Sequence, residues 1–328
     1  MTSSQLDVVA IGDAIVDVIA TCDDSFIAAR GLAKGSMQLL TTSEADELYM
    51  AMGPARESSG GSAANSMAGL AGLGLDVAFI GQIADDQLGE IFAHDMTSLG
   101  VRFETAPLSD GPPTGRCLIL VTPDAQRTMN TSPGASHELT PQALDEPLIR
   151  SAAITFLEGY LWGPKRPRAA MLRAAEIAHA AGRTVAFTLS ESLCIAGRRE
   201  GVRAMIDAGT IDILFGNEDE IRHLTGRGDL DACIAELEGS VKTLVVTKGA
   251  DGALAVEGGR RVEIAAAPVA KIVDTTGAGD LFAAGFLAAR CRRRDLEACL
   301  QAGAACAAEI ISHFGARPEK DLKTLVKL

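Results

Sequence analysis

Short apolar runs alternate along the chain with longer amphipathic or alanine-rich stretches. Apolar runs of this length, bounded by turn residues, are typical of strands buried on both faces of a parallel sheet. The predicted strands are residues 8–11, 77–80, 153–157, 185–189, 211–215 and 244–247. The predicted helices are residues 63–73, 88–99, 168–181, 218–224, 231–237, 281–290 and 296–312. The alternation predicts an α/β fold whose mostly parallel sheet is covered by helices on both faces.

Two segments interrupt this alternation, at residues 17–59 and 102–132. They contain short β-like pieces between Gly and Pro residues, such as residues 117–122. We interpret them as a small β-sheet set on a single domain of residues 1–328. A sheet in this place is able to act as a lid that closes over a cleft and excludes water.

The composition narrows the class of protein. Hydrophobic residues make up 47% and charged residues 22% of the 328 residues, which is typical of a globular protein. The net charge of −13 argues against binding to nucleic acid or to an anionic membrane surface. No apolar run approaches the length of a membrane span, and seven cysteines without a C-x-x-C pair indicate neither a zinc site nor a disulfide framework. We expect a cytoplasmic monomer or homodimer whose partners are small molecules.

The candidate chemistry centres on residues 274–280, Asp-Thr-Thr-Gly-Ala-Gly-Asp, which join a predicted strand end to a helix. The glycines allow a ligand to approach the backbone, and the first N–H groups of a helix favour an anion. The N–H groups of Gly277, Ala278 and Gly279 are therefore candidates to bind a phosphate. Asp280 lies in the first helical turn and is the candidate general base. Close packing with a dipole partner is the structural alternative.

Polar groups near two other element boundaries are candidates to bind hydroxyl groups. Gly60, Gly61, Ser62 and Asn65 precede and open a predicted helix, where N–H groups, a hydroxyl and an amide converge. The carboxylates that follow the first predicted strand are Asp13 and Asp17. Ligands of open α/β sheets bind beyond the carboxyl ends of the strands, so these groups are placed to accept bonds from a sugar. A capped helix and solvated turn residues are the structural alternatives.

Candidates for a nucleotide and its metal follow two later strands. Asn217 and Glu220 are three residues apart, and their oxygens suit Mg²⁺ held through its water shell. A helix N-cap with an acidic first turn has the same pattern. Thr247, Gly249 and Gly252 belong to a strand end that either wraps a nucleotide or forms a hairpin turn.

Absent motifs exclude several enzyme classes. The chain has no Gly-Lys dipeptide and therefore no Walker A loop, and its G-x-G pairs lack the third glycine of dinucleotide-binding folds. It also has no G-x-S-x-G and no H-E-x-x-H sequence, which weakens esterase and zinc-protease interpretations.

The ordered set of motifs resembles the ribokinase or PfkB family of carbohydrate and nucleoside kinases. Residues 60–74 resemble the N-terminal signature of that family, residues 274–285 resemble its C-terminal signature, and Asn217-x-x-Glu220 stands between them. Residues 212–218 and 113–117 are similar to segments of adenosine kinases. The resemblance implies a ribokinase-like, doubly wound fold with a small β-sheet lid.

The resemblance also implies roles for individual residues. Asp17, the glycine pair Gly60 and Gly61, and Asn65 would hold a ribose, while Gln38 would lie near a base. Arg127, in the lid, would reach towards the transferring phosphate. The carbonyl groups of Asp274 and Thr276 would lie at a monovalent cation site, with K⁺ as a candidate cofactor beside ATP and Mg²⁺.

We therefore expect an enzyme that transfers the γ-phosphate of ATP to a primary hydroxyl of an adenosine-like nucleoside. A sugar kinase acting on ribose, fructose or a keto-sugar acid is the alternative. A non-catalytic nucleoside or sugar sensor, which keeps the cleft without the chemistry, is a further alternative.

Overall fold

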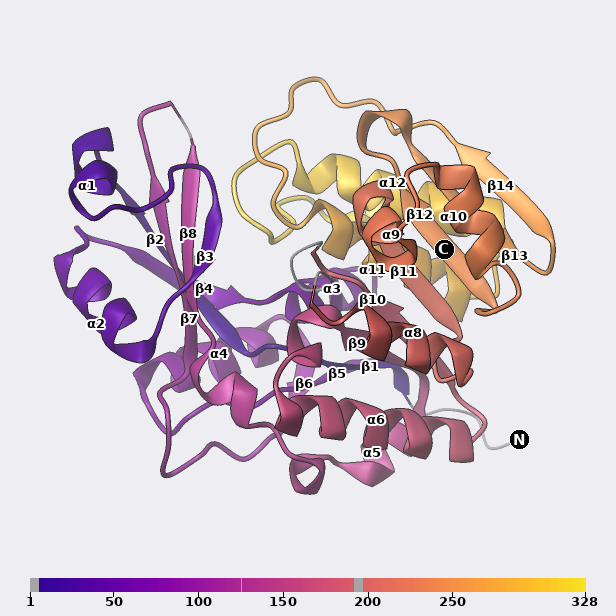
Figure 1. The fold of residues 1–328 in the computed structure, drawn as a ribbon, viewed down its shortest axis with the longest axis horizontal. Coiled ribbons are helices and arrows are strands. Elements are labelled where there is room, and N and C mark those ends of the chain that lie inside the picture. Colours follow the sequence, from indigo (N-terminus) through magenta and orange to yellow (C-terminus); the bar gives the residue numbers. More distant parts are fainter. Residues whose placement is uncertain (1–5, 125, 192–196) are drawn as a thin grey trace.

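The computed structural model describes residues 6–124, 126–191 and 197–328 (Figure 1). Its large sheet has nine strands in the order β14-β13-β12-β11-β10-β9-β1-β5-β6. The strands from β12 to β6 pair in parallel, whereas β13 pairs antiparallel with both β12 and β14. The strands of this sheet are β1 (Leu6–Ile11), β5 (Val77–Ile80), β6 (Val101–Phe103), β9 (Ala152–Glu158), β10 (Thr184–Thr188), β11 (Ile213–Asn217), β12 (Thr243–Thr247), β13 (Ala253–Glu257) and β14 (Arg260–Ile264).

Both faces of the large sheet are buried, because its strands send alternate apolar side chains into two cores. In β1, Val8 and Ala10 contribute to one core, and Val9 and Ile11 contribute to the other. All four side chains are fully buried. Continuous apolar runs are what such doubly covered parallel strands require.

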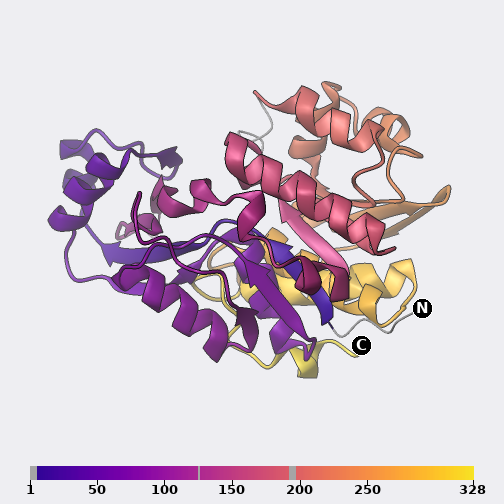
Figure 2. The same ribbon diagram turned by 90° about the horizontal axis from the view of Figure 1, so that it is seen from below.

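Helices pack on both faces of this sheet (Figures 1 and 2). The helices of the first core are α3 (Ser62–Gly72), α4 (Gln87–Ser98), α11 (Ala278–Cys291), α12 (Leu296–Ile310) and the short α13 (Leu322–Leu325). The helices of the second core are α5 (Glu146–Ser151), α6 (Lys165–Ala180), α8 (Arg199–Asp207), α9 (Glu218–Thr225) and α10 (Leu230–Leu237). Four short 3₁₀ turns cover residues 134–138, 141–143, 159–162 and 249–251.

A second, small sheet stands beside the carboxyl ends of the large one (Figure 1). It has five strands in the order β3-β8-β7-β2-β4. Its elements are β2 (Ile15–Thr21), β3 (Met37–Leu39), β4 (Arg56–Gly60), β7 (Gly115–Val121) and β8 (Arg127–Ser132), together with α1 (Asp24–Ala29) and α2 (Thr42–Ala51). One face of the small sheet, here called the outer face, contributes Val18, Leu118 and Leu120 to the first core. The opposite face, the inner face, carries a separate apolar cluster of Ile15, Cys117 and Ile119.

The predicted fold class is confirmed, and each predicted element of the large sheet and its helices is present within a few residues. The strand expected at residues 211–215 begins at Ile213, because the Asp212 carboxylate accepts a hydrogen bond from Val185 N–H at 2.7 Å before the ladder starts. The elements that were not predicted include α1, α2, α5, α8, β6 and β14.

Two further findings bear on the predicted class of protein. No helix among the described residues is long and apolar enough to cross a membrane. The six cysteines that the structure describes are free thiols, and Cys194 lies outside the described residues.

Candidate active site

Residues 274–280, the catalytic loop, form a braced turn into α11. Gly277 is the N-cap of this helix, with a left-handed φ of 79°, and a Cβ added there would lie 2.9 Å from the Cβ of Ala316. Glycine is therefore needed for both conformation and space. The Asp274 carboxylate accepts bonds from Thr276 N–H (3.0 Å) and Gly315 N–H (3.0 Å).

The N–H groups predicted to bind a phosphate differ in their availability. Ala278 N–H donates to the Thr275 carbonyl at 3.2 Å. Within the described part of the chain, the N–H groups of Gly277 and Gly279 have no hydrogen-bond acceptor. The opening of α11 thus presents two free donors beside Asp280, as an anion site requires.

The Asp280 carboxylate is held by side chains of another helix. Ser62 Oγ donates to Oδ1 at 2.6 Å and Asn65 Nδ2 donates to Oδ2 at 2.8 Å. Burial raises the pKa of Asp280, while these two bonds and the positive charge of Arg317 lower it. The structure therefore brings Asp280 into direct contact with two other predicted residues that lie 215 or more positions before it in the sequence.

The glycine pair allows two carboxylates to approach the start of α3. A Cβ added at Gly60 would lie 2.6 Å from the Asp17 carboxyl carbon, and one added at Gly61 would collide with the Asp13 carbonyl. Burial raises the pKa of both Asp13 and Asp17 to about 6. Asp13 Oδ1 is buried and has no hydrogen-bond partner among the residues that the structure describes, so it is able to accept a bond from a ligand hydroxyl.

Glu158, at the end of β9, is a site residue that the sequence interpretation missed. Its fully buried carboxylate accepts bonds from Asp13 N–H at 2.5 Å and Ala63 N–H at 2.6 Å. Burial and the neighbouring Asp13 carboxylate raise the pKa of Glu158 well above its ordinary value. Its place at the carboxyl end of a predicted strand is the signal that could have identified it.

Arg127 and Gln38, two of the predicted residues in the small sheet, lie on opposite faces. Arg127, on β8, is paired with the Asp274 carboxylate and donates to Thr276 Oγ1 at 3.2 Å. Gln38 does not lie beside Arg127 and Asp274. It is in register with Asn130 on β8, and its side chain donates to Asn130 Oδ1 at 2.8 Å. Residues that alternate along β8 point to opposite faces, so Asn130 and Gln38 face away from Arg127.

A pocket of about 70 Å³ lies between residues predicted to hold the acceptor and residues predicted to hold the nucleotide and its metal. Its lining includes Ser62, Asp280, Asn217, Glu220 and Thr247. Gly249 and Gly252 lie outside this lining, in the turn between β12 and β13, where both have a positive φ.

Asn217 and Glu220 form a reciprocal cap on α9. Asn217 Oδ1 accepts from Glu220 N–H at 2.8 Å, and the Glu220 carboxylate accepts from Asn217 N–H at 2.9 Å and from its Nδ2 at 2.8 Å. Burial raises the pKa of Glu220 to about 7. The oxygen donors fit a hydrated divalent cation, whose charge would favour the ionised carboxylate. The described residues contain no cluster of three or more His, Cys, Asp or Glu placed to bind a metal directly.

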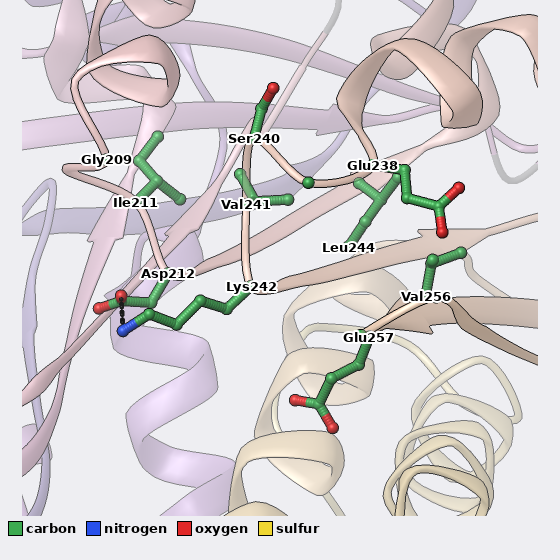
Figure 3. A pocket seen from close by; sticks show the side chains of 13 residues that line it. Gly209, Ile211, Asp212, Glu238, Ser240, Val241, Lys242, Leu244, Val256 and Glu257 are labelled. Atoms are coloured by element: carbon green, nitrogen blue, oxygen red, sulfur yellow. Dashed lines mark ion pairs between the residues drawn. The ribbon is translucent and has the colours of Figure 1, made fainter.

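A pocket larger than the one beside Asp280 lies at the other end of the parallel strands, and Figure 3 shows the side chains that line it. It has a volume of about 610 Å³ and is lined by apolar side chains such as Ile211, Val241 and Leu244. Lys242 crosses its edge and pairs with Asp212 at 2.8 Å. None of the predicted site residues lines it.

Comparison with known proteins places these features in a family. Residues 5–322 match the model of the family described as pfkB family carbohydrate kinase. The solved structure of an adenosine kinase from Sinorhizobium meliloti has a TM-score of 0.91 and 45% sequence identity, covering 98% of this chain and 98% of that chain.

Two curated relatives have other acceptors in their names. An ATP-dependent ribose-1-phosphate kinase from Halopiger xanaduensis is 32% identical over 301 residues, which cover 88% of this chain and 94% of the relative. A 5-dehydro-2-deoxygluconokinase from Shouchella clausii is 30% identical over 263 residues, which cover 77% of this chain and 80% of the relative.

Proposed function

The chain belongs to the pfkB family of carbohydrate kinases, and from that premise we propose that it transfers the γ-phosphate of ATP to the primary hydroxyl of an adenosine-like nucleoside. The observation that carries the proposal is the position of Asp280. Its carboxylate is bound to the start of α3 through Ser62 and Asn65, and it borders the pocket that contains Asn217 and Glu220. A base between an acceptor loop and a nucleotide pocket suits phosphoryl transfer.

Asp280 receives the proton of the attacking hydroxyl. A free hydroxyl is much less acidic than a carboxylic acid, so the proton moves late and positioning supplies most of the rate. Meanwhile the free N–H groups of Gly277 and Gly279 stabilise charge on the transferring group. Each well-placed donor of this kind contributes about 3 kcal/mol.

The acceptor hydroxyls are held by carboxylates on the other side of the base. Asp13 Oδ1 is buried and has no partner, and Asp17 borders the glycine pair. Carboxylate oxygens accept hydrogen bonds from vicinal hydroxyl groups, which suits a ribose ring. Glu158 holds the backbone of Asp13 and Ala63 and so fixes both elements that approach the acceptor.

Asn217 and Glu220 would hold a hydrated Mg²⁺ beside the nucleotide phosphates. The bound cation neutralises phosphate charge during transfer. Thr247 lines the same pocket and is placed to contact the nucleotide. We also propose K⁺ as an activator at the carbonyl groups of Asp274 and Thr276, which accept no hydrogen bond within the described residues.

Two observations favour a nucleoside over the other acceptors. The inner face of the small sheet carries the apolar side chains of Ile15, Cys117 and Ile119, which suit a base better than a hydroxylated chain. The carboxylates around the acceptor position would repel an anionic acceptor such as ribose 1-phosphate or a keto-sugar acid. They are Asp13, Asp17 and Asp280.

A panel of acceptors tests the proposal. The purified protein is incubated with ATP, Mg²⁺ and, separately, adenosine, ribose, fructose, ribose 1-phosphate and 5-dehydro-2-deoxygluconate, and ADP release is measured. We expect adenosine to give the highest kcat/KM. A higher kcat/KM for ribose or fructose would show that the acceptor is a neutral sugar rather than a nucleoside. Binding of an acceptor without ADP release would indicate a sensor.

A further inference from the structure

The segment that follows α12 returns to the catalytic loop. Val273 N–H donates to the Ile311 carbonyl at 2.9 Å, and Gly315 N–H donates to the Asp274 carboxylate at 3.0 Å. Ala316, the next residue, packs against Gly277. Further along this segment, the N–H groups of Glu319 and Lys320 donate to the Glu309 carboxylate at the end of α12. The segment is thus fixed on both sides of residue 317.

Arg317 extends from this segment to the acceptor loop, defined as residues 59–65. One guanidinium nitrogen donates to the Ala64 carbonyl at 3.0 Å. The other donates to the Ser59 carbonyl at 2.9 Å and to Ser59 Oγ at 3.0 Å. These acceptors lie on either side of Gly60, Gly61 and Ser62, so a single planar side chain spans the turn that precedes α3.

The charge of Arg317 lies among carboxylates with which it forms no hydrogen bond. It lowers the pKa of Asp17 and of Asp280, opposing the effect of their burial. Burial lowers the pKa of Arg317 itself to about 10, so the guanidinium stays charged near neutral pH. Arg127 on β8 also lowers the pKa of Asp17, and Asp280 itself raises it. Asp280 in turn raises the pKa of Glu158 on β9 and of Glu220 on α9, and Asp95 on α4 is a third carboxylate that acts on Arg317.

We propose that Arg317 is a positioning residue of this kinase. Its guanidinium clamps the acceptor loop to the segment that braces the catalytic loop, and its charge opposes the carboxylates that face the acceptor. Arg317 does not touch the reacting atoms. It acts through Ser62 and Asn65, which hold Asp280 and belong to the clamped loop. This role rests on the proposed function for its purpose, but its geometry can be tested without turnover.

Hydrogen exchange tests the clamp. In Arg317→Met, we expect the amides of residues 59–65 to exchange about tenfold faster or more, while β9 and β10 keep their protection. Arg317→Lys keeps the charge but cannot span both carbonyls, so it should show the same local loss. Arg292→Met is the matched control, because Arg292 bonds Asp7 and the Gly74 carbonyl away from the site. Unchanged protection of residues 59–65 in both Arg317 variants would overturn the clamp.

An NMR titration tests the charge. The carboxyl resonance of Asp280 is assigned from its absence in Asp280→Asn. We expect the pKa of Asp280 to rise by about one unit in Arg317→Met and to stay near the parent value in Arg317→Lys. A purely structural role predicts the same titration in both variants, and that result would remove the electrostatic part of the proposal. Neither measurement needs an acceptor. If the protein phosphorylates nothing in the panel, the proposed function is refuted, but hydrogen exchange and the NMR titration still show whether Arg317 positions the acceptor loop.

Discussion

Asp280 is bound by Ser62 and Asn65 from α3, so the position of the predicted base depends on the start of α3 as well as on its own helix. In contrast, the carboxylate of Asp274 in the same loop is paired with Arg127. The two carboxylates of one motif therefore have different tasks. Asp280 lines the pocket and is the proposed base, whereas Asp274 holds the loop to β8.

We expect Asp280→Asn to lower kcat by about 10²- to 10⁴-fold while ATP and acceptor still bind. Asparagine retains the size of the side chain and one acceptor oxygen, but it cannot take a proton. Steady-state kinetics combined with calorimetric binding measures both effects. Asp207→Asn, an exposed carboxylate on α8, serves as the control. Turnover close to that of the parent would show that another group is the base.

Asp17 gives a prediction about pH. Burial raises its pKa from the ordinary 3.8 to about 6 in the folded chain, so the folded chain holds a proton that the unfolded chain releases. This contribution to stability is present below about pH 4 and is lost as the pH rises through about 6. The affinity for the substrate should instead rise with pH, because the ionised Asp17 carboxylate accepts stronger hydrogen bonds from the substrate hydroxyls than the protonated form does.

Between about pH 5 and about pH 7, the parent should therefore bind its acceptor more tightly as its unfolding free energy falls. In Asp17→Asn the acceptor should bind more weakly at every pH. The decline in stability should also become shallower, with Asp13 still titrating over the same range. Calorimetry and urea unfolding at several pH values measure the two trends. Identical pH profiles of stability in parent and variant would contradict this account.

At the residue scale, the sequence shows which side chains belong to motifs but not which distant groups support them. Asp280, Ser62 and Asn65 stand in recognisable short patterns, and the structure brings them into contact. Glu158 and Arg317 belong to no such pattern, because their partners are backbone groups that lie far away in the chain. Only the folded chain shows those contacts.

At the scale of elements, Asn217 and Glu220 combine a helix cap with a predicted metal role, and two substitutions separate the roles. Asn217→Ala removes the cap and should lower the unfolding free energy by about 1 kcal/mol. Asn217→Ser keeps a good N-cap but loses the amide. If the amide serves Mg²⁺, both variants should need more Mg²⁺ for half-maximal activity, and only Asn217→Ala should be destabilised. If the activity of both variants depends on Mg²⁺ concentration as that of the parent does, the helix cap is the only role of Asn217.

The inner strands of the large sheet, from β12 to β5, were predictable because burial on both faces gives each a continuous apolar run. The edge strands β6 and β14 were not predicted, because exposed charged residues interrupt their apolar positions. The helices α1, α2 and α5 were missed because they are short or lie within segments interpreted as β-structure. One of them had a usable signal. Thr41 and Glu44 form a capping box at the start of α2, a pattern that can be recognised from spacing alone.

At the scale of the whole molecule, the small sheet shares its hydrophobic core with the large one. Leu118, on β7, is fully buried in the same cluster as Val8 and Phe79 of the large sheet. The inner face, by contrast, has only its own small cluster. The small sheet is therefore anchored on one side, and its inner face is the side that is able to meet a ligand.

This shared core predicts that the two sheets unfold together. Leu118→Ala should lower the unfolding free energy by about 2 to 5 kcal/mol. The single tryptophan, Trp162, lies in the second core, so its fluorescence reports on a region remote from Leu118. We expect its urea transition to shift together with the transition in far-UV circular dichroism. A Trp162 midpoint that stays at the parent value would show instead that the small sheet unfolds independently.

The order of the site residues along the chain has a consequence for biosynthesis. Asp13 and Asp17 leave the ribosome well before Asp280 and Arg317, because they lie more than 250 residues earlier in the chain. Domains fold as the growing chain emerges, so the carboxylates for the acceptor are present long before the base. A chain interrupted before α11 would carry those carboxylates without the group that receives the proton. On this order, the predicted base and the arginine that holds its partners join the site only after the carboxylates are in place.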